Sequence, residues 1–174
     1  KHEKQIDILV NNAGAIHSSL FEMSNAKKFK DLFETNFFSQ IEIIQNSLKM
    51  MKKKQNGTIV NISSTSGDDN NFGRSIYSAT KASFNSLTKS LSNELSVYKI
   101  RVNAISPGLT ETDMMKENTS KEVIEKIISR NPLKRLASPD EIANVALFLA
   151  SNLSSYVNGQ VIRVDGGIQY YDQF

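Results

Sequence analysis

Short apolar segments alternate with long helical patterns along this chain, and this alternation restricts the fold more than any other feature. Four segments rich in Ile and Val are bounded by turn residues: Ile6–Val10, Thr58–Ile62, Arg101–Ile105 and Gln160–Val164. Such segments are typical of strands that are buried on both faces. The stretches between them are long enough for crossover helices, so the strands can run parallel. The sequence therefore predicts an α/β protein with a doubly wound parallel sheet whose strands follow chain order.

Four helical patterns separate or follow these strands: about Ala26–Lys53, Ser75–Tyr98, Lys121–Arg130 and a segment that begins after Ser138. The first three show apolar residues at three-and-four spacing. Ser24 or Asn25 can cap the first helix. Ser138 is followed by a proline at the first helical position and by Glu141, which completes a capping box. Because no linker or repeat divides the chain, residues 1–174 are expected to form one domain or most of one.

The composition excludes several classes of protein. It is ordinary for a globular protein, with 39% hydrophobic and 22% charged residues, and the net charge of +3 is too small to indicate a nucleic-acid partner. No apolar run approaches the length of a membrane span. Without cysteines the chain has no disulfide, thiolate nucleophile or cysteine–zinc site, and His2 and His17 are too few for a histidine-rich metal site. We expect a cytoplasmic protein with no metal, no nucleic-acid partner and no membrane partner.

The beginning of the chain is unusual. It opens at Lys1 without a methionine, and within a few residues it reaches the buried-type strand Ile6–Asn11. Domains seldom start so abruptly. We therefore expect further sequence on the N-terminal side of Lys1.

Tyr77 and Lys81 are the first candidates for chemistry. Positions i and i+4 of a helix share a face, so the phenol and the ammonium are expected to lie near each other. Lysine is among the least buried residue types, so a lysine at the edge of an apolar stripe needs a reason. A nearby cation lowers the pKa of a phenol and brings it closer to useful proton transfer at neutral pH. For the pair alone, a surface tyrosine beside a solvated lysine is the commoner arrangement.

Further polar residues lie where the predicted strands end. Ser64 follows the strand Thr58–Ile62, outside the carboxyl end where α/β sheets place ligands, and its hydroxyl can hydrogen-bond a carbonyl oxygen. Asn36 interrupts the apolar stripe of the first helix, either as part of a polar network with a held water or bonded to a neighbouring backbone. Asn11–Gly14 and Pro107-Gly108 close the first and third strands on the same side. Taken singly, such residues at strand ends are also typical of ordinary turns.

Together these residues resemble the short-chain dehydrogenase/reductase family. Five motifs carry the likeness, in this order: Asn11-Asn12-Ala13-Gly14, Asn36, Ser64 with Tyr77-x-x-x-Lys81, Pro107-Gly108 with Thr110 and Thr112, and Asp165-Gly166-Gly167. They are similar to the N-N-A-G motif, the helical asparagine, the catalytic serine with Y-x-x-x-K, the P-G-x-x-x-T segment and the C-terminal D-G-G of that family. Any one motif is weak, but five in order on the expected elements are a strong signal.

The resemblance implies a Rossmann-like fold and a role for each residue. Tyr77 would protonate the carbonyl oxygen during reduction or deprotonate the alcohol during oxidation, while Ser64 would bind and polarise the substrate carbonyl. Lys81 would lower the pKa of Tyr77 and hydrogen-bond the nicotinamide ribose, and Asn36 would hold a water that links Lys81 to solvent. The residues left for cofactor binding, besides Tyr77 and Lys81, would be Asn12, Gly14, Pro107, Thr110 and Thr112. The cofactor would be NADP or NAD, with NADPH favoured.

One part of the family pattern is absent from the chain. The glycine-rich phosphate loop, T-G-x-x-x-G-x-G, would precede Lys1, together with three strands and their helices. By this resemblance the chain would be the C-terminal portion of a dinucleotide-binding domain. The other portion would cradle the pyrophosphate at a helix N-terminus and carry the residue that separates NAD from NADP.

The C-terminal segments favour one subgroup. Four of them look most like bacterial-type 3-oxoacyl-(acyl-carrier-protein) reductases: Pro107–Met114, Pro132-Leu133, Ser138–Ala143 and Phe148–Ser151. The substrate would be a small-molecule carbonyl or one bound to an acyl carrier protein. Sugar, polyol and secondary-alcohol dehydrogenases share these features, and a truncated, inactive binding subunit is the alternative from another class. The helices Ala26–Lys53 and Ser75–Tyr98 would pair between subunits in a homodimer or homotetramer.

Overall fold

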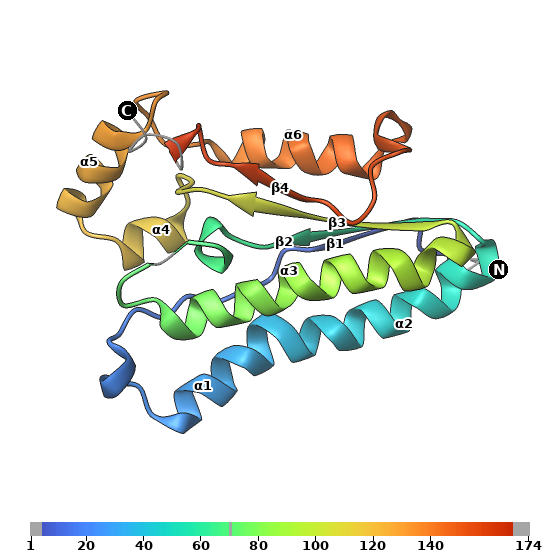
Figure 1. Ribbon diagram of the computed structural model, residues 1–174, viewed down its shortest axis with the longest axis horizontal. Coiled ribbons are helices and arrows are strands. Elements are labelled where there is room, and N and C mark those ends of the chain that lie inside the picture. Colours follow the sequence, from blue (N-terminus) through green and yellow to red (C-terminus); the bar gives the residue numbers. More distant parts are fainter. Residues whose placement is uncertain (1–4, 70, 169–174) are drawn as a thin grey trace.

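The computed structural model describes residues 5–69 and 71–168. It confirms the predicted sheet, which is parallel throughout and follows chain order. The strands are β1 (Ile8–Asn11), β2 (Gly57–Ile62), β3 (Ile100–Pro107) and β4 (Val161–Val164). Their carboxyl ends lie at one edge of the sheet, where Figure 1 shows the helices α4 (Asp113–Asn118) and α5 (Lys121–Arg130).

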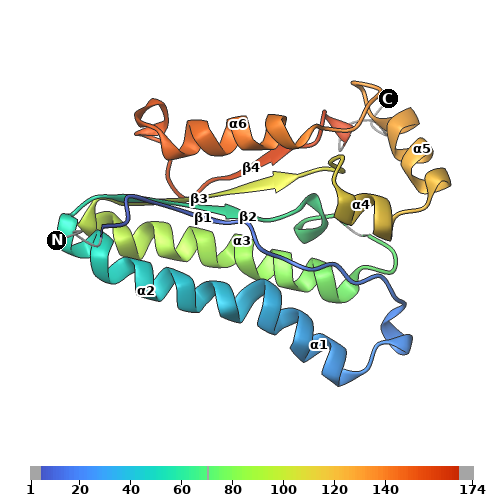
Figure 2. The ribbon, with the colours of Figure 1, turned by 180° about the vertical axis from the view of Figure 1, so that it is seen from behind.

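Helices cover both faces of the sheet, as a doubly wound fold requires (Figures 1 and 2). One face carries α1 (Ala26–Phe33), α2 (Ser39–Lys54) and α3 (Ser75–Leu95), and the other carries α6 (Pro139–Ala150). Shorter helical turns complete the described chain: η1 (Phe21–Met23), η2 (Glu34–Phe38), η3 (Thr65–Gly67), η4 (Ser96–Tyr98) and η5 (Asn152–Ser154). In the described ranges, every helix is too short or too polar to cross a lipid bilayer.

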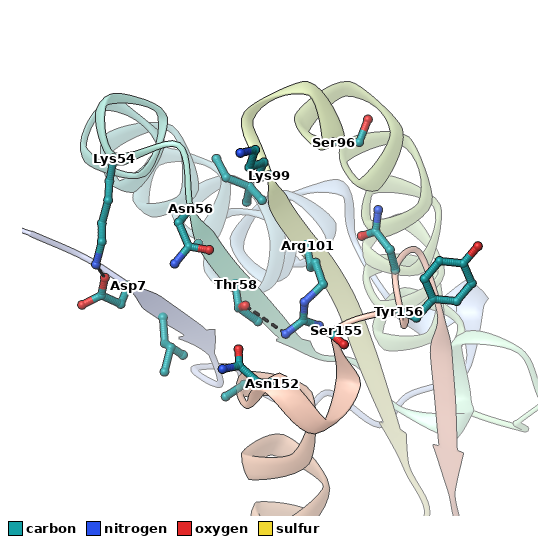
Figure 3. A pocket seen from close by; sticks show the side chains of 15 residues that line it. Asp7, Lys54, Asn56, Thr58, Ser96, Lys99, Arg101, Asn152, Ser155 and Tyr156 are labelled. Carbon is teal, nitrogen blue, oxygen red and sulfur yellow. Dashed lines mark hydrogen bonds and ion pairs between the residues drawn. The ribbon is translucent and has the colours of Figure 1, made fainter.

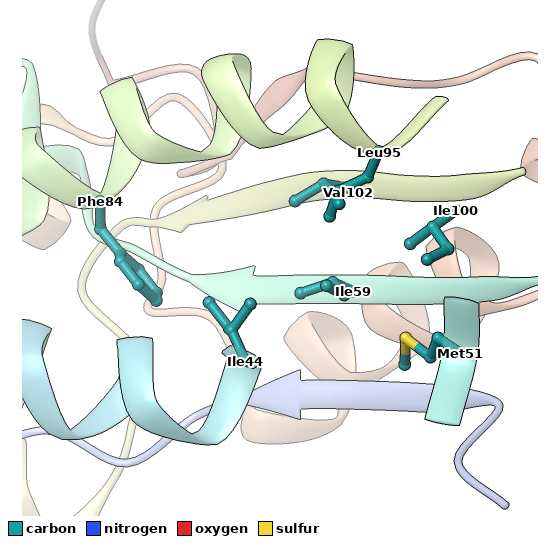
Figure 4. Close-up of a cluster of buried hydrophobic side chains, with 7 residues drawn as sticks. All are labelled: Ile44, Met51, Ile59, Phe84, Leu95, Ile100 and Val102. Carbon is teal, nitrogen blue, oxygen red and sulfur yellow. The ribbon is translucent and has the colours of Figure 1, made fainter. Parts of the chain in front are cut away.

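Two apolar clusters hold these layers together. Between the sheet and the α2–α3 layer lie Ile44, Met51, Ile59, Phe84, Leu95, Ile100 and Val102 (Figure 4). Between the sheet and α6 lie Val60, Ile105, Ile142 and Leu149. Ile59 and Val60 are neighbours in β2 that point to opposite faces, and both are fully buried. This two-sided burial explains why β2 and β3 are rich in Ile and Val, and each fully buried side chain stabilises the fold by roughly 1.5–3 kcal/mol. The prediction of two-sided burial is wrong for β1, where Ile8 and Val10 are 49% and 45% exposed.

The first predicted helix, Ala26–Lys53, is not continuous. A π-helical turn, η2, separates α1 from α2, and the fully buried Asn36 lies in this turn. Its carboxamide accepts a hydrogen bond from the Ala15 amide at 2.7 Å and donates one to the Ala15 carbonyl at 2.8 Å. A buried amide must be satisfied, and the wider π turn lets its side chain pair with the loop after β1. Sequence periodicity does not reveal such a turn.

The predicted helix ends agree well with the structure elsewhere. Asn25 caps α1, and Ser138 with Glu141 forms the capping box of α6. The helix expected over Ser75–Tyr98 is α-helical to Leu95 and ends as the 3₁₀ turn η4. Sequence analysis missed α4, whose first turn is capped by the Thr112 hydroxyl.

Candidate active site

The residues predicted for catalysis lie at the carboxyl edge of the sheet. Asn12 and Gly14 follow β1, Ser64 follows β2, and the segment from Pro107 to Thr112 leaves the end of β3. The first turns of α3, which carry Tyr77 and Lys81, begin at this same edge (Figure 2). Parallel strand order brings these segments together because adjacent strands end side by side.

Lys81 lies deeper than the sequence indicated. We predicted a lysine at the edge of an apolar stripe, but the side chain is only 4% exposed. Its ammonium donates a hydrogen bond to the Ile62 carbonyl at 2.8 Å and lies 5.8 Å from the centroid of the Tyr77 ring. A Cβ placed on Gly14 would lie 3.6 Å from the same ammonium. The buried cation thus lies between the tyrosine, the end of β2 and the loop after β1.

Burial perturbs the protonation of both groups. It lowers the pKa of Lys81 to about 8. It raises the pKa of Tyr77, and this effect outweighs a hydrogen bond with the Ser64 side chain and the positive charge of Arg74, which both lower it. The expectation that Lys81 sets a depressed pKa for Tyr77 therefore does not hold for this structure. The phenol stays protonated at neutral pH, which is the state of a proton donor.

Ser64 is held at the start of a tight turn. Its hydroxyl oxygen accepts a hydrogen bond from the Ser66 amide at 3.1 Å and so caps η3. The preceding Ser63 donates from its amide to the Ile105 carbonyl at 2.7 Å and from its hydroxyl to the Lys81 carbonyl at 3.3 Å. A Cβ on Gly67 would come within 3.0 Å of the Lys81 carbonyl carbon, so η3 lies directly against α3. These contacts fix the serine beside the helix that carries the tyrosine.

The Asn36 side chain is already fully engaged as a donor. Besides its two bonds with Ala15, its amide nitrogen donates to the Thr80 hydroxyl at 3.2 Å. Thr80 in turn donates to the Tyr77 carbonyl at 2.7 Å. Both hydrogens of the Asn36 side-chain amide are used in these bonds. A water can therefore bind Asn36 only by donating a hydrogen bond to one of its oxygens. The side chain joins the Gly14 loop to α3, which is the structural alternative that the sequence left open.

The remaining predicted cofactor residues lie on two loops. Asn12 is exposed beside the buried Asn11, whose side chain donates to Asn61 at 2.8 Å within the sheet. Pro107 is the last residue of β3, and the Thr110 hydroxyl donates to the Gly108 carbonyl at 3.1 Å. Thr112 accepts the α4 cap bond from the Met115 amide at 3.2 Å. Its hydroxyl hydrogen remains available to donate to a ligand.

Three residues near this site escaped sequence analysis. Thr80 links Asn36 to the backbone of Tyr77, the charge of Arg74 offsets part of the rise in the Tyr77 pKa, and Gly67 permits close contact between η3 and α3. No spacing rule marks any of the three, because each acts through contacts between separate elements.

A cleft of about 780 Å³ lies at the opposite, amino-terminal edge of the sheet (Figure 3). Its lining includes the starts of β2 and β3 and none of the predicted site residues. The Arg101 guanidinium in it donates to the carbonyls of Leu149 and Ser151 at 2.9 and 3.2 Å and to the Thr58 hydroxyl at 3.2 Å. This arginine caps the end of α6, so the charge in the cleft has a structural role. Elsewhere in residues 5–69 and 71–168, no group of three or more His, Cys, Asp or Glu side chains is placed to hold a metal ion.

Comparison with known proteins agrees with the fold. The family model described as enoyl-(acyl carrier protein) reductase matches residues 1–169. The 3-oxoacyl-[acyl-carrier-protein] reductase of Aquifex aeolicus is 45% identical over 163 residues, which cover 94% of this chain and 65% of that protein. The chain spans about 65% of the length of such curated relatives.

Solved structures share the fold closely. A gluconate 5-dehydrogenase from Burkholderia cenocepacia, in complex with NADP and tartrate, superposes with a TM-score of 0.92 at 30% identity, covering 97% of this chain and 66% of that one. A 7α-hydroxysteroid dehydrogenase, complexed with NADH and 7-oxo glycochenodeoxycholic acid, superposes with a TM-score of 0.90 at 36% identity, covering 94% and 64%. These two proteins are named for compounds as different as gluconate and a hydroxysteroid, so the shared fold alone does not identify a substrate.

Proposed function

The chain belongs to the short-chain dehydrogenase/reductase family, and from this premise we propose that the protein carrying it reduces a 3-oxoacyl group on an acyl carrier protein with NADPH or NADH. The observation that carries the proposal is the Ser64, Tyr77 and Lys81 arrangement at the carboxyl edge, with Lys81 buried as a cation. The identity of 45% to a 3-oxoacyl-[acyl-carrier-protein] reductase supports the choice of substrate.

The described residues fit the nicotinamide end of a dinucleotide. The Lys81 ammonium donates one bond, to Ile62, and an ammonium carries three hydrogens, so it can also hold a ribose hydroxyl. Gly14 lies on the same side, and Asn12 would lie beside the adenosine end of the cofactor. On the loop that Pro107 opens, the Thr110 backbone and the Thr112 hydroxyl would hold the nicotinamide carboxamide. The nicotinamide supplies the hydride when bound. The other steps fall to the side chains of this chain.

Proton transfer is the task we assign to Tyr77. Its raised pKa keeps the phenol protonated at neutral pH, so it can donate to the carbonyl oxygen as hydride reaches the carbon. Ser64 lies within hydrogen-bonding reach of Tyr77 and would orient the same oxygen. Asn36 holds the Gly14 loop and Thr80 against each other, and we propose that a water on its acceptor oxygen resupplies the proton through Lys81.

Apolar side chains at this edge support an apolar substrate. Phe72 precedes Tyr77 by five residues and is 91% exposed, and Met114, in α4, is 42% exposed. Exposed apolar groups near a site favour a ligand that buries them. The second candidate is oxidoreduction of a sugar, polyol or secondary alcohol, favoured by the likeness to gluconate and hydroxysteroid dehydrogenases. The alternative from another class is a truncated binding subunit that catalyses no reaction.

A substrate panel tests the proposed function. Consumption of NADPH and of NADH would be followed by absorbance with a 3-oxoacyl thioester, a ketosteroid and a keto-sugar acid. We expect the highest kcat/KM for the 3-oxoacyl thioester. A keto-sugar acid as the best substrate would favour the second candidate. A protein that binds cofactor but reduces none of the three would favour the binding subunit.

Replacement of Ser64 by alanine is expected to lower kcat by about tenfold, less than loss of the proton donor, because Tyr77 still reaches the carbonyl. Ser66→Ala is the matched control, since its own amide, not its hydroxyl, contacts Ser64. Steady-state kinetics with the best substrate checks the result. Unchanged turnover in Ser64→Ala would contradict the role of this hydroxyl.

We propose that the protein assembles as a homodimer or homotetramer through α2 and α3. Phe38, Ile43 and Val97 lie on this side and are 49%, 47% and 72% exposed. Light scattering of the protein is expected to give a mass of two or four chains, and Ile43→Glu should lower it. A monomeric mass in dilute and concentrated samples would contradict the proposal.

A further inference from the structure

An ion-pair cluster joins the loop after β2 to the strand β4. Arg163, in β4, donates from both terminal nitrogens to the two carboxylate oxygens of Asp69, at 2.8 and 2.7 Å. Its Nε donates to the Asp165 carboxylate at 2.5 Å. The side chains of Arg163, Asp69 and Asp165 are 18%, 38% and 7% exposed. Arg163 and Asp69 are 94 positions apart in the chain, so their contact is a long-range tertiary one.

The geometry of this cluster gives it more rigidity than a surface ion pair. Paired parallel N–H···O bonds between a guanidinium and a carboxylate fix the orientation as well as the distance of the partners. The Asp165 carboxylate accepts the remaining bond of the guanidinium, from Nε. This carboxylate is fixed in turn, because it also accepts a hydrogen bond from the Gly167 amide at 2.9 Å. The backbone carbonyl of Asp165 also accepts from Asn131 at 2.9 Å. Asp165 thus holds the Arg163 guanidinium at the end of β4 independently of its contact with Asp69.

Asp69 is connected to Ser64 by consecutive backbone bonds. The Gly67 amide donates to the Ser64 carbonyl at 2.9 Å, and the Asp69 amide donates to the Thr65 carbonyl at 2.9 Å. Residues 64–69 therefore form one compact turn. A shift of Asp69 would be passed through this turn to the Ser64 hydroxyl.

We propose that Arg163 is a positioning residue that holds Ser64 in place through Asp69, an inference that rests on the function proposed for Ser64. The other fixed points of the turn, Ser63 and Gly67, lie on its inner side against β3 and α3. Arg163 holds the turn of residues 64–69 from the side of β4. A displacement of about 1 Å in a positioned group is enough to lower turnover by up to a hundredfold.

The first test replaces Arg163 by methionine, which keeps an unbranched apolar stem and removes the fork of donors. We expect kcat to fall by about tenfold and the dissociation constant of the cofactor to stay unchanged. Arg163→Lys should recover only part of the loss, because an ammonium cannot pair with Asp69 in two parallel bonds. Arg135→Met is the matched control: it removes a two-bond pair, with Glu141 at 2.7 Å, that lies outside the cluster.

A double-mutant cycle with Ser64→Ala separates positioning from general destabilisation. If Arg163 acts through Ser64, then Arg163→Met lowers kcat about tenfold in the parent and less than about twofold in the Ser64→Ala protein. The same fold-loss in both backgrounds would overturn the proposal. Asp69→Asn, which leaves Arg163 in place, should repeat this behaviour and serves if Arg163→Met does not fold.

Amide hydrogen exchange supplies a readout that needs no activity. Arg163→Met should speed exchange at the amides of Ser66, Gly67 and Asp69, while those of β2 keep their protection. Unchanged protection of the turn would overturn the proposal. Lost protection in a protein that reduces no carbonyl would leave the positioning role standing and count against the proposed function instead.

Discussion

Replacement of Tyr77 by phenylalanine is expected to lower the turnover of carbonyl reduction by about a hundredfold or more, the magnitude typical for loss of a general acid. The ring keeps its shape and its place beside Ser64, so only the proton donor is lost. Cofactor affinity should stay within about twofold of the parent value, because Lys81 still holds the ribose. Steady-state kinetics and fluorescence titration with NADPH measure the two effects separately.

Tyr98→Phe is the matched control for this experiment. Tyr98 belongs to η4, and its ring lies 4.4 Å from the Lys52 ammonium, so it takes no part in the carboxyl-edge site. It should leave turnover unchanged. Near-normal turnover in Tyr77→Phe would show that Tyr77 is not the proton donor and that the Y-x-x-x-K spacing has no catalytic role here.

Comparison of the parent with Tyr77→Phe also measures the pKa of Tyr77. Because burial raises its pKa, the phenol should lose its proton only above the ordinary value of about 10. Reduction, which uses the phenol, is thus favoured at neutral pH, and oxidation, which needs the phenolate, should rise as the pH approaches that pKa. The difference in tyrosinate absorbance between the parent and Tyr77→Phe, titrated without cofactor, measures it. A midpoint well below 10 would support the lowered pKa of Tyr77 that the sequence predicts.

Replacement of Lys81 by methionine is expected to impair two steps at once. Turnover should fall by about a hundredfold, since the proton relay is broken, and the dissociation constant of the cofactor should rise by about tenfold or more, since a charged hydrogen bond to the ribose is lost. Lys89→Met, at an exposed position of the same helix, is the control and should change neither value. A turnover loss with unchanged cofactor affinity would argue against the ribose contact.

Lys81 also makes the stability of the fold depend on pH. Below pH 8 the ammonium is charged in both the folded and the unfolded state, and its burial costs about 3 kcal/mol, the equivalent of a pKa lowered from 10.5 to about 8. Between about pH 8 and 10.5 only the unfolded state holds the proton, so the stability contribution of this group rises with pH. Urea denaturation of the parent and of Lys81→Met should show the parent gaining about 3 kcal/mol relative to the variant between pH 7 and 10.5. A pH-independent difference would place the ammonium in water instead of the interior.

The sequence predicted the layered fold well because the fold depends on local patterns. Each strand is a short run of Ile and Val, and the capping box at Ser138 and Glu141 marks the start of α6 without reference to the rest of the molecule. The family motifs likewise lie on single elements, and the structure places Ser64, Tyr77 and Lys81 at one edge of the sheet. Their catalytic and cofactor roles stay predictions until the variants are measured.

Features that depend on contacts between distant elements were beyond sequence analysis. The depth of Lys81 depends on how α3 meets the end of β2, and the π turn at Asn36 depends on the loop at Ala15. The raised pKa of Tyr77 follows from its burial, which no spacing in the sequence gives. The pairing of Arg163 with Asp69 depends on the order of the strands in space, because 94 positions separate the two residues.

The long span of the Arg163–Asp69 contact also sets an order of events during synthesis. The strand β4, which carries Arg163, leaves the ribosome after β1, β2 and β3, and contacts between distant positions form late because chain closure is costly. A nascent chain can therefore complete α3, with Tyr77 and Lys81 in place, while the turn at Ser64 still lacks its anchor on β4. The addition of β4 would complete the site, so a chain interrupted before β4 would keep its chemical groups without their working geometry.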